Sequence, residues 1–330
     1  MAAGERVVTI YLRERARAGR RLVAEALLER IERLGFARAV LLRGVEGFGH
    51  HGLESDRLLS LSEDLPLVVI AVDREERAAA LLAAPELAEC GAVTVERLSL
   101  GAGEAQAEAQ LKLTAWLPRH GPLGGRPPVL RAVDLLRSAG ATAAIALLGV
   151  DGVVGGVRRR ASLLRRNAEV PALVVGVGGR EAILSAQRTL AEDEAVVGVD
   201  LERVGEPGRS VGQLPSGWQA KLTLFLPAGA GPGQTPFAQL AVQEFRLLGA
   251  PGATVLRGLY GFFNGGPIEG ERALRLRRGT PHLVLAVLPP QLADEAVARL
   301  AAVGRSGLLA LERVPTYLPR LGRDRGEAVG

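Results

Sequence analysis

The chain has 330 residues and a hydrophobic content of 48%, which is enough to bury the cores of two or three globular domains. Its 41 basic and 36 acidic residues leave a net charge of only +5, and every basic residue except Lys112 and Lys221 is an arginine, which indicates biased codon usage rather than a nucleic-acid-binding surface. A single cysteine, Cys90, excludes an internal disulfide, and the apolar runs are too short to span a bilayer, so we expect a cytoplasmic protein.

The first part of the chain combines strand and helix periodicity in a fixed order. Apolar and polar residues alternate where a strand is expected, and apolar residues recur every third or fourth position where a helix is expected. The expected elements are, in chain order, a strand over 7–12, a helix over 23–34 with Gly35 as its C-cap, a strand ending at Gly44, a strand over 67–72 after Pro66, a helix over about 74–89 and a strand closing on Glu96-Arg97-Leu98. This order is βαββαβ.

The same order occurs three times along the chain. Pro66, Pro171 and Pro281 each open an apolar strand, and each copy closes on a Glu-Arg pair. Five further positions keep their spacing, as Thr9, Gly19, Gly35, Gly44 and Gly47, then Thr114, Gly124, Gly140, Gly149 and Gly152, then Thr223, Gly233, Gly249, Gly258 and Gly261. A repeat of this length fits a whole small domain, so we predict units over 5–100, 110–205 and 218–318, with later second helices over about 180–194 and 291–303.

Segments of the first and third copies resemble the uncharacterised PII-like domain family, whose domains normally occur once per chain. The resemblance is carried by residues 40–49 (VLLRGVEGFG), 61–66 (LSEDLP) and 252–258 (GATVLRG), and it is weaker in the second copy, where Leu148 replaces the arginine and Val153 the phenylalanine. It implies the PII fold, in which three ferredoxin-like subunits form a trimer, small ligands bind in clefts between subunits and a long loop signals to a partner. We therefore expect an α+β protein whose three tandem ferredoxin-like βαββαβ units form a PII-like pseudo-trimer in a monomeric chain.

One face of each first strand is expected to line the interior of this arrangement. A ferredoxin-like sheet carries its helices on one face, so the other face must be covered by something else. Tyr11, Trp116 and Phe225 occupy one position of the first strand in the three copies, on the face that carries Thr9. We expect this face to be shared by the three units. In the alternative, these aromatic residues pack beneath the helices and the strand leucines face outward.

The strongest candidate site is the exit of each second strand. Glycines let a ligand approach the backbone closely, and exposed amides beside an arginine suit phosphate or carboxylate. The candidate ligand-binding residues are Arg43, Gly44, Glu46, Gly47 and Gly49 in the first copy, Gly149, Asp151 and Gly152 in the second, and Arg257, Gly258, Tyr260 and Gly261 in the third. The alternative is that the glycines shape a turn and the arginine pairs with an acid across the interface.

A second candidate set lies near the final strands. Arg97, Arg203 and Arg313 recur where the PII-like resemblance implies basic residues that face a neighbour's cleft. They are expected to hold a phosphate, or alternatively to pair with an acid at a seam between units. His50 and His51 are adjacent, so on an extended segment they point in opposite directions, and we expect no metal site.

The loops after the second strands differ in charge. The first is acidic, whereas the second and third are rich in arginine, at Arg158–Arg160 and at 272–278. Such long exposed loops are typical interaction sites, and they are also compatible with an ordinary solvated surface.

Together these features favour a PII-like, non-enzymatic regulatory protein that binds a small anionic ligand, with an adenine nucleotide as the expected class. No Ser/His/Asp or Cys/His group recurs, so we expect no enzyme activity. One alternative is a scaffold with vestigial clefts that docks a protein partner, for which the resemblance implies a membrane transporter or channel such as a fluoride exporter. Another alternative is nucleic-acid binding through the arginine-rich loops, which a steep salt dependence would reveal.

Overall fold

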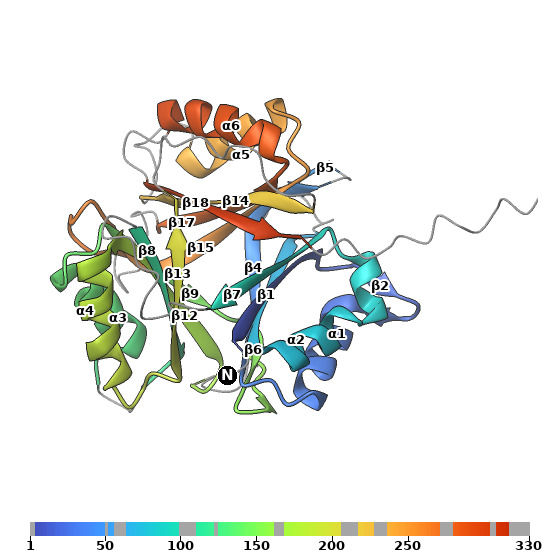
Figure 1. Ribbon diagram of the computed structural model, residues 1–330, viewed down its shortest axis with the longest axis horizontal. Helices are drawn as coiled ribbons and strands as arrows, with labels where there is room; N and C mark the ends of the chain where they lie inside the picture. Colours follow the sequence, from blue (N-terminus) through green and yellow to red (C-terminus); the bar gives the residue numbers. More distant parts are fainter. Residues whose placement is uncertain are drawn as a thin grey trace, which may run out of the picture.

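The computed structural model describes residues 4–49, 52–55, 64–98, 110–121, 125–161, 168–205, 217–227, 236–270, 280–303 and 308–316. Within these ranges the protein is a mixed α/β structure with six α-helices and mostly antiparallel strands. Figure 1 shows three lobes around a common centre, with strands on the inside and helices on the outside. In the described ranges no helix is both long enough and apolar enough to cross a membrane.

The elements form three consecutive sets, which we call units 1, 2 and 3. Unit 1 contains β1 (Glu5–Arg13), β2 (Arg17–Ala18), β3 (Arg21–Leu22), α1 (Val23–Arg33), β4 (Arg38–Gly49), β5 (Gly52–Ser55), β6 (Pro66–Arg74), α2 (Glu75–Leu82), the 3₁₀-helix η1 (Pro85–Glu89) and β7 (Ala92–Leu98). Unit 2 contains β8 (Gln110–Pro118), α3 (Pro128–Ser138), β9 (Ala143–Leu148), β10 (Asp151–Val154), β11 (Val157–Arg158), β12 (Pro171–Gly179), α4 (Arg180–Ala191) and β13 (Gly198–Val204). Unit 3 contains β14 (Trp218–Leu226), α5 (Phe237–Leu247), β15 (Ala253–Phe263), β16 (Glu269–Gly270), β17 (His282–Leu288), α6 (Pro290–Val303) and β18 (Leu308–Pro315).

Every unit pairs its four main strands in the same antiparallel order. The last strand lies beside the first, the first beside the third, and the third beside the second, giving β7-β1-β6-β4, β13-β8-β12-β9 and β18-β14-β17-β15. The main elements follow each other as strand, helix, strand, strand, helix, strand, which is the order that the sequence predicts.

The structure corrects the ends of several expected elements. The helix expected over 74–89 ends at Leu82, and a separate 3₁₀-helix begins at Pro85, because proline lacks the N–H that would continue the helix. The second strands of units 1 and 3 do not end at Gly44 and Gly258 but continue to Gly49 and Phe263. Both extensions pair with another unit, the extension of β4 with β15 and the extension of β15 with β9.

The second strands join the units at their boundaries. β4 of unit 1 pairs with β15 of unit 3, β15 pairs with β9 of unit 2, and β10 of unit 2 pairs with β4. All three pairings are antiparallel, so backbone hydrogen bonds link each unit to both others in a closed ring.

Buried side chains form one cluster per unit and one cluster that all three units share. Beneath the helices of unit 2, for example, Leu111 and Leu113 pack against α3 and α4. The opposite face of the sheets forms the shared cluster, which contains Trp116 and Phe225 with Tyr11 packed against it. The predicted interior face of the first strands therefore does face the other units.

Candidate functional site

The predicted glycines lie where strands of two units cross. A Cβ built on Gly47 of β4 would lie 2.5 Å from the carbonyl oxygen of Ala253 in β15 and 2.9 Å from Cγ of Pro66. A Cβ on Gly44 would lie 2.7 Å from the same Pro66 atom. Such approaches are far inside ordinary van der Waals contact, so only glycine fits at either position.

The other two boundaries repeat this packing. Cβ atoms on Gly149 and Gly152 would both overlap Pro171. They would also overlap β4, at Val40 for Gly149 and at the carbonyl oxygen of Ala39 for Gly152. On Gly258 and Gly261 they would approach Pro281 and strand β9, at 2.5 Å from Ile145 and 2.7 Å from the carbonyl oxygen of Ala144. Strand crossing therefore accounts for all six glycines, and contact of their amides with a ligand stays a prediction.

Three further predicted residues lie within these strand pairings. Glu46 is opposite Ser55 of β5 and Val255 of β15, and Gly49 is opposite Gly52. Tyr260 packs against the core of unit 2 and is opposite Gly270 of β16. Glu46 and Tyr260 therefore lie at boundaries between units, whereas Gly49 pairs within unit 1.

Asp151 is buried in an ion-pair network across the boundary of units 1 and 2. Its Oδ2 lies 2.6 Å from Nη2 of Arg158, and that guanidinium also donates two hydrogen bonds of 2.9 Å to Glu25 on α1. Oδ1 of Asp151 accepts a hydrogen bond from the backbone N–H of Gly152. In the same segment, Arg160 pairs with Glu25 and Arg159 pairs with Glu169. These basic side chains of the second loop therefore already have acidic partners.

The equivalent positions Arg43, Leu148 and Arg257 differ in their surroundings. Arg43 is held by the carboxylate of Glu14 in its own unit, with an Nη2–Oε2 distance of 2.9 Å. Leu148 offers no charge. Arg257 donates from Nε to the hydroxyl of Thr280 at 2.8 Å, and no carboxylate pairs with it within the described ranges.

The edge of unit 3 around Arg257 has its own polar set. Thr280 is buried, and His282, at the start of β17, lies opposite Arg257 in the β15–β17 ladder. Burial, and then the Arg257 charge, lower the pKa of His282 to about 4, so its imidazole is neutral at neutral pH. We call Arg257, Thr280 and His282 the unit 3 edge site. A guanidinium, a hydroxyl and a neutral imidazole are donors that suit a phosphate or carboxylate.

The arginines of the final strands point away from the interior. Arg97, Arg203 and Arg313 are exposed, whereas the glutamates that precede them are buried. This follows from the alternation of side chains along a strand. The Glu-Arg signature thus marks a central site, but its glutamates form that site.

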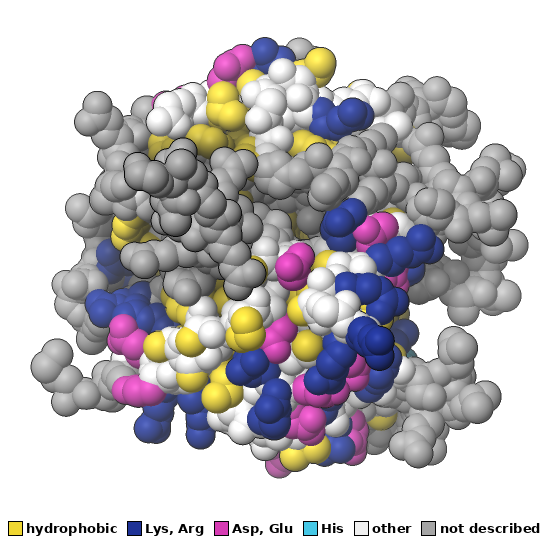
Figure 2. All heavy atoms as spheres, turned by 90° about the vertical axis from the view of Figure 1, so that its right-hand side faces the viewer, with side chains coloured by type: hydrophobic (Ala, Val, Ile, Leu, Met, Phe, Trp, Pro, Cys, Tyr) yellow, Lys and Arg dark blue, Asp and Glu magenta, His cyan; other side chains and the backbone are white. Residues whose placement is uncertain are grey.

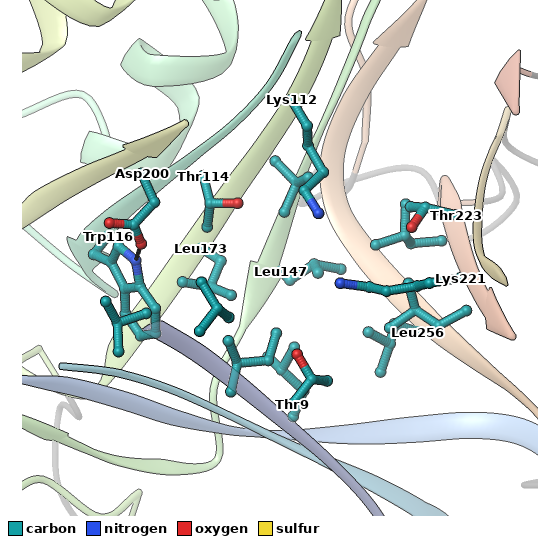
Figure 3. Close-up of a pocket in the computed structure, with 17 residues that line it drawn as sticks. Thr9, Lys112, Thr114, Trp116, Leu147, Leu173, Asp200, Lys221, Thr223 and Leu256 are labelled. Carbon is teal, nitrogen blue, oxygen red and sulfur yellow. Dashed lines mark hydrogen bonds between the residues drawn. The ribbon is translucent and has the colours of Figure 1, made fainter. Parts of the chain in front are cut away.

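The three glutamates meet the only two lysines of the chain at the centre. Nζ of Lys112 lies 2.9 Å from Oε2 of Glu202 and 2.5 Å from Oε1 of Glu312. Nζ of Lys221 donates to both oxygens of Glu96, at 2.8 and 2.9 Å, and lies 3.8 Å from Oε2 of Glu312. We call these five residues the ionic centre. Figure 3 shows the two amino groups pointing toward one another, with Thr9, Thr114 and Thr223 around the same space.

A small cavity of about 50 Å³ adjoins the ionic centre. Most of its lining residues are apolar and come from all three units, among them Leu42, Leu173 and Leu256. A cavity of this volume is too small for a nucleotide.

A further buried polar group marks the boundary of units 1 and 2. Asp200 accepts hydrogen bonds from Nη2 of Arg38 at 2.8 Å and from Nε1 of Trp116 at 2.5 Å. Burial raises the pKa of Asp200 to about 6, although Arg38 and Trp116 oppose the shift. The guanidinium of Arg38 also lies over the Trp116 ring.

Several sequence predictions fall outside the described residues. These are the adjacent His50 and His51 and the arginine-rich segment 272–278. Over the face that carries unit 1, Figure 2 shows basic and acidic side chains interleaved rather than segregated. A nucleic-acid-binding face would instead be dominated by basic residues.

The ionic centre is the feature that sequence reasoning missed. The signal was available, because Lys112 and Lys221 occupy one position of the first strand in two copies, on the same strand face as Thr114 and Thr223. Residues two positions apart on a strand share a face, so the lysines lie on the interior face with the threonines. The recurring glutamates would then have been expected to meet these lysines there.

Comparison with known proteins gives one family and several distant structural matches. The model of the family DUF190, "Uncharacterized ACR", matches residues 5–100 and 219–316. A crystal structure of an unknown protein from Galdieria sulphuraria has 10% sequence identity and a TM-score of 0.20, covering 63% of this chain and 99% of that one. The structure of an anthrone oxidase-like protein has 13% identity and a TM-score of 0.20, covering 68% and 98%.

Proposed function

This chain belongs to the DUF190 family, which is uncharacterised, and we propose from its geometry that it is a non-enzymatic PII-like regulatory protein. In this proposal three tandem ferredoxin-like βαββαβ units form a single-chain pseudo-trimer. The units bind a small anionic ligand, of which an adenine nucleotide is the expected class, at an edge between units, and adjacent loops signal its presence to a partner.

The unit 3 edge site carries this proposal. Of the three equivalent positions, Arg43 is neutralised by Glu14, and Leu148 has no charge. Arg257 alone combines a guanidinium that has no carboxylate partner within the described ranges with a neighbouring hydroxyl and a neutral imidazole. We therefore expect one competent site per chain rather than three.

The surroundings of the only cysteine support a non-enzymatic role. Burial, with Glu89 and Glu86 adding to the effect, raises the pKa of the Cys90 thiol to about 12. The thiol therefore stays protonated and weakly nucleophilic at neutral pH.

Isothermal titration calorimetry against ATP, ADP, AMP and cyclic nucleotides tests the proposal. We expect saturable binding near one ligand per chain. Arg257→Ala should weaken it by roughly 10- to 100-fold, because a charge-assisted hydrogen bond contributes about 1.5–3 kcal/mol. The matched control is Arg43→Ala at the equivalent position, which should leave the affinity within about twofold because Glu14 already occupies that arginine.

Equal loss of binding in both variants would contradict the unit 3 edge site. Absence of binding to every nucleotide would contradict the sensor proposal and favour a second function, a scaffold that docks a protein partner such as a membrane transporter or channel. The Arg43–Glu14 pair and Leu148 favour that second function, because they leave two of the three edges without a free cation.

A further inference from the structure

The ion pairs of the ionic centre follow a cyclic rule. Each lysine contacts the glutamate of its own unit and the glutamate of the next unit: Lys112 contacts Glu202 and Glu312, and Lys221 contacts Glu312 and, across the closing boundary, Glu96. A third lysine, in unit 1, would lie between Glu96 and Glu202. The ring of ion pairs is therefore complete at two boundaries and open at the third.

Val7 occupies the position of that third lysine. It lies opposite Glu96 in the β1–β7 ladder, as Lys112 lies opposite Glu202, and it lines the same cavity as both lysines. Two polar atoms at this place, Oε1 of Glu202 and the hydroxyl oxygen of Tyr11, are buried and have no hydrogen-bond partner within the described ranges.

The gap leaves the ionic centre with one surplus carboxylate. Three carboxyl groups face two ammonium groups, and the side chains of all five residues are only 4–9% exposed. An unpaired buried carboxylate is strongly unfavourable, so something must neutralise it. The carboxylate oxygens lie within 4.8 Å of one another, as ligands of a metal ion would, but the two ammonium groups already contact all three of them. A proton needs no additional space.

We propose that Glu96 and Glu202 hold one proton between them in the gap left by Val7, and that loss of this proton weakens the contacts among the three units as the pH rises. The proton joins the two carboxyl groups by a hydrogen bond from Glu202 to Glu96, in place of the missing ammonium group.

The pKa values of Glu202 and Glu96 shift in opposite directions, as a proton held on Glu202 requires. Burial raises the pKa of Glu202 well above its usual value; Lys112 and Lys221 oppose the shift, whereas the Glu312 and Glu96 charges add to it. Burial acts against ionisation of Glu96 as well, but Lys221, Lys112 and the hydrogen bond from Glu202 lower its pKa to about 2. Lys221 donates to both oxygens of Glu96, whereas Oε1 of Glu202 has no hydrogen-bond partner within the described ranges, so Glu202 is the carboxylic acid and Glu96 the carboxylate.

The groups that face Glu202 come from five strands: Glu96 on β7, Glu312 on β18, Lys112 on β8, Lys221 on β14 and Tyr11 on β1. The pKa values of both lysines and of Tyr11 are raised, so these groups keep their protons into the alkaline range. Because the folded-state pKa of Glu202 exceeds its unfolded value, the stability it contributes is complete below about pH 4.5 and is lost as the pH rises through the folded-state pKa.

The test is urea unfolding between about pH 6 and about pH 9 at constant ionic strength. For the wild type, the folding equilibrium constant should fall by up to about tenfold per pH unit as the proton leaves. Glu202→Gln keeps a hydrogen-bond donor that does not titrate, and Val7→Lys supplies the missing ammonium group. In both variants the slope of the folding equilibrium constant against pH should therefore disappear. The matched control Arg203→Gln, at the exposed neighbour of Glu202, should keep it.

Equal slopes for the wild type and Glu202→Gln would overturn the proposal. Stabilisation of the wild type, but not of Val7→Lys, by potassium or ammonium in place of sodium would also overturn it, because a cation rather than a proton would then fill the gap. Infrared spectroscopy of the folded wild type gives an independent measurement. A protonated carboxyl band near neutral pH, absent from Glu202→Gln, supports the shared proton, and a wild type without that band contradicts it.

Discussion

The charge of His282 at the unit 3 edge is controlled by its immediate neighbours. Its imidazole is largely buried and lies beside Arg257, and both conditions disfavour the protonated form. A neutral imidazole can donate or accept one hydrogen bond without adding a second positive charge. Under the proposed function, the site binds an anion through one guanidinium charge and two neutral groups.

The His282 pKa gives a prediction with a definite sign. The folded-state pKa of about 4 lies below the ordinary 6.5, so the contribution of His282 to stability is complete above about pH 6.5 and is lost as the pH falls through about 4. The full difference is about 3 kcal/mol. NMR titration of the His282 ring should give a midpoint near 4, and Arg257→Ala should raise it part of the way to 6.5 because burial remains.

A ring that titrates near 6.5 in the wild type would contradict the described burial of His282. A site-specific measurement is needed because Asp200 acts with the opposite sign. Its raised pKa of about 6 means that its contribution is complete below about pH 3.8 and is lost as the pH rises through about 6, so the two effects oppose each other in global unfolding.

At the scale of elements, the strand crossings at the unit boundaries decide how closely the sheets approach. Each crossing places a glycine of one second strand against the proline that opens a third strand and against a strand of another unit. The ladder between β10 and β4, for example, places Gly152 opposite Val40, where an added Cβ would overlap the carbonyl oxygen of Ala39. An added methyl group would have to displace a strand rather than a side-chain tip.

Gly152→Ala should therefore destabilise the protein by about 1–3 kcal/mol, the cost of overpacking a close contact. The matched control is Gly4→Ala, outside any helix, where an added Cβ meets nothing within 4 Å. This control should change stability by only a few tenths of a kcal/mol. Denaturant unfolding of both variants measures the difference, and equal effects would show that the crossing tolerates a side chain.

The order of elements within each unit is predictable because every strand and helix has its own periodicity. Gly35, for example, directly follows the C-cap residue Leu34 of α1 and takes the positive φ of +68° that ends many helices. The extension of β4 beyond Gly44 is not predictable in this way, since its partner β15 is remote in sequence and belongs to another unit. The proposed unit boundaries and the ligand role of the predicted site residues stay predictions.

The ionic centre is predictable only in part. Strand alternation places Lys112 and Glu202 on one face of unit 2, and the recurrence of the Glu-Arg pair indicates that the other units contribute equivalent glutamates. The missing positive charge at Val7 could not be inferred from unit 1 alone, because valine is a common residue in strands. Its effect on charge arises only where the three sheets meet.

At the scale of the whole molecule, three boundaries of the same type hold different side chains. The boundary of units 1 and 2 has the buried Arg38–Asp200 pair and the Arg158 network. The ring of Lys–Glu pairs is open between Glu96 and Glu202, the glutamates of the same two units. Identical subunits could not produce these differences. Under the proposed function, three units in one chain would allow one edge to specialise in ligand binding while another closes.

Lysine accessibility shows directly whether the three units enclose one ionic centre. The chain has only two lysines, and both belong to that centre. After treatment of the native protein with an amine-reactive reagent, mass spectrometry of its peptides should find Lys112 and Lys221 unmodified, whereas the urea-unfolded protein should be modified at both. Rapid labelling of either lysine in the native protein would contradict the enclosed centre.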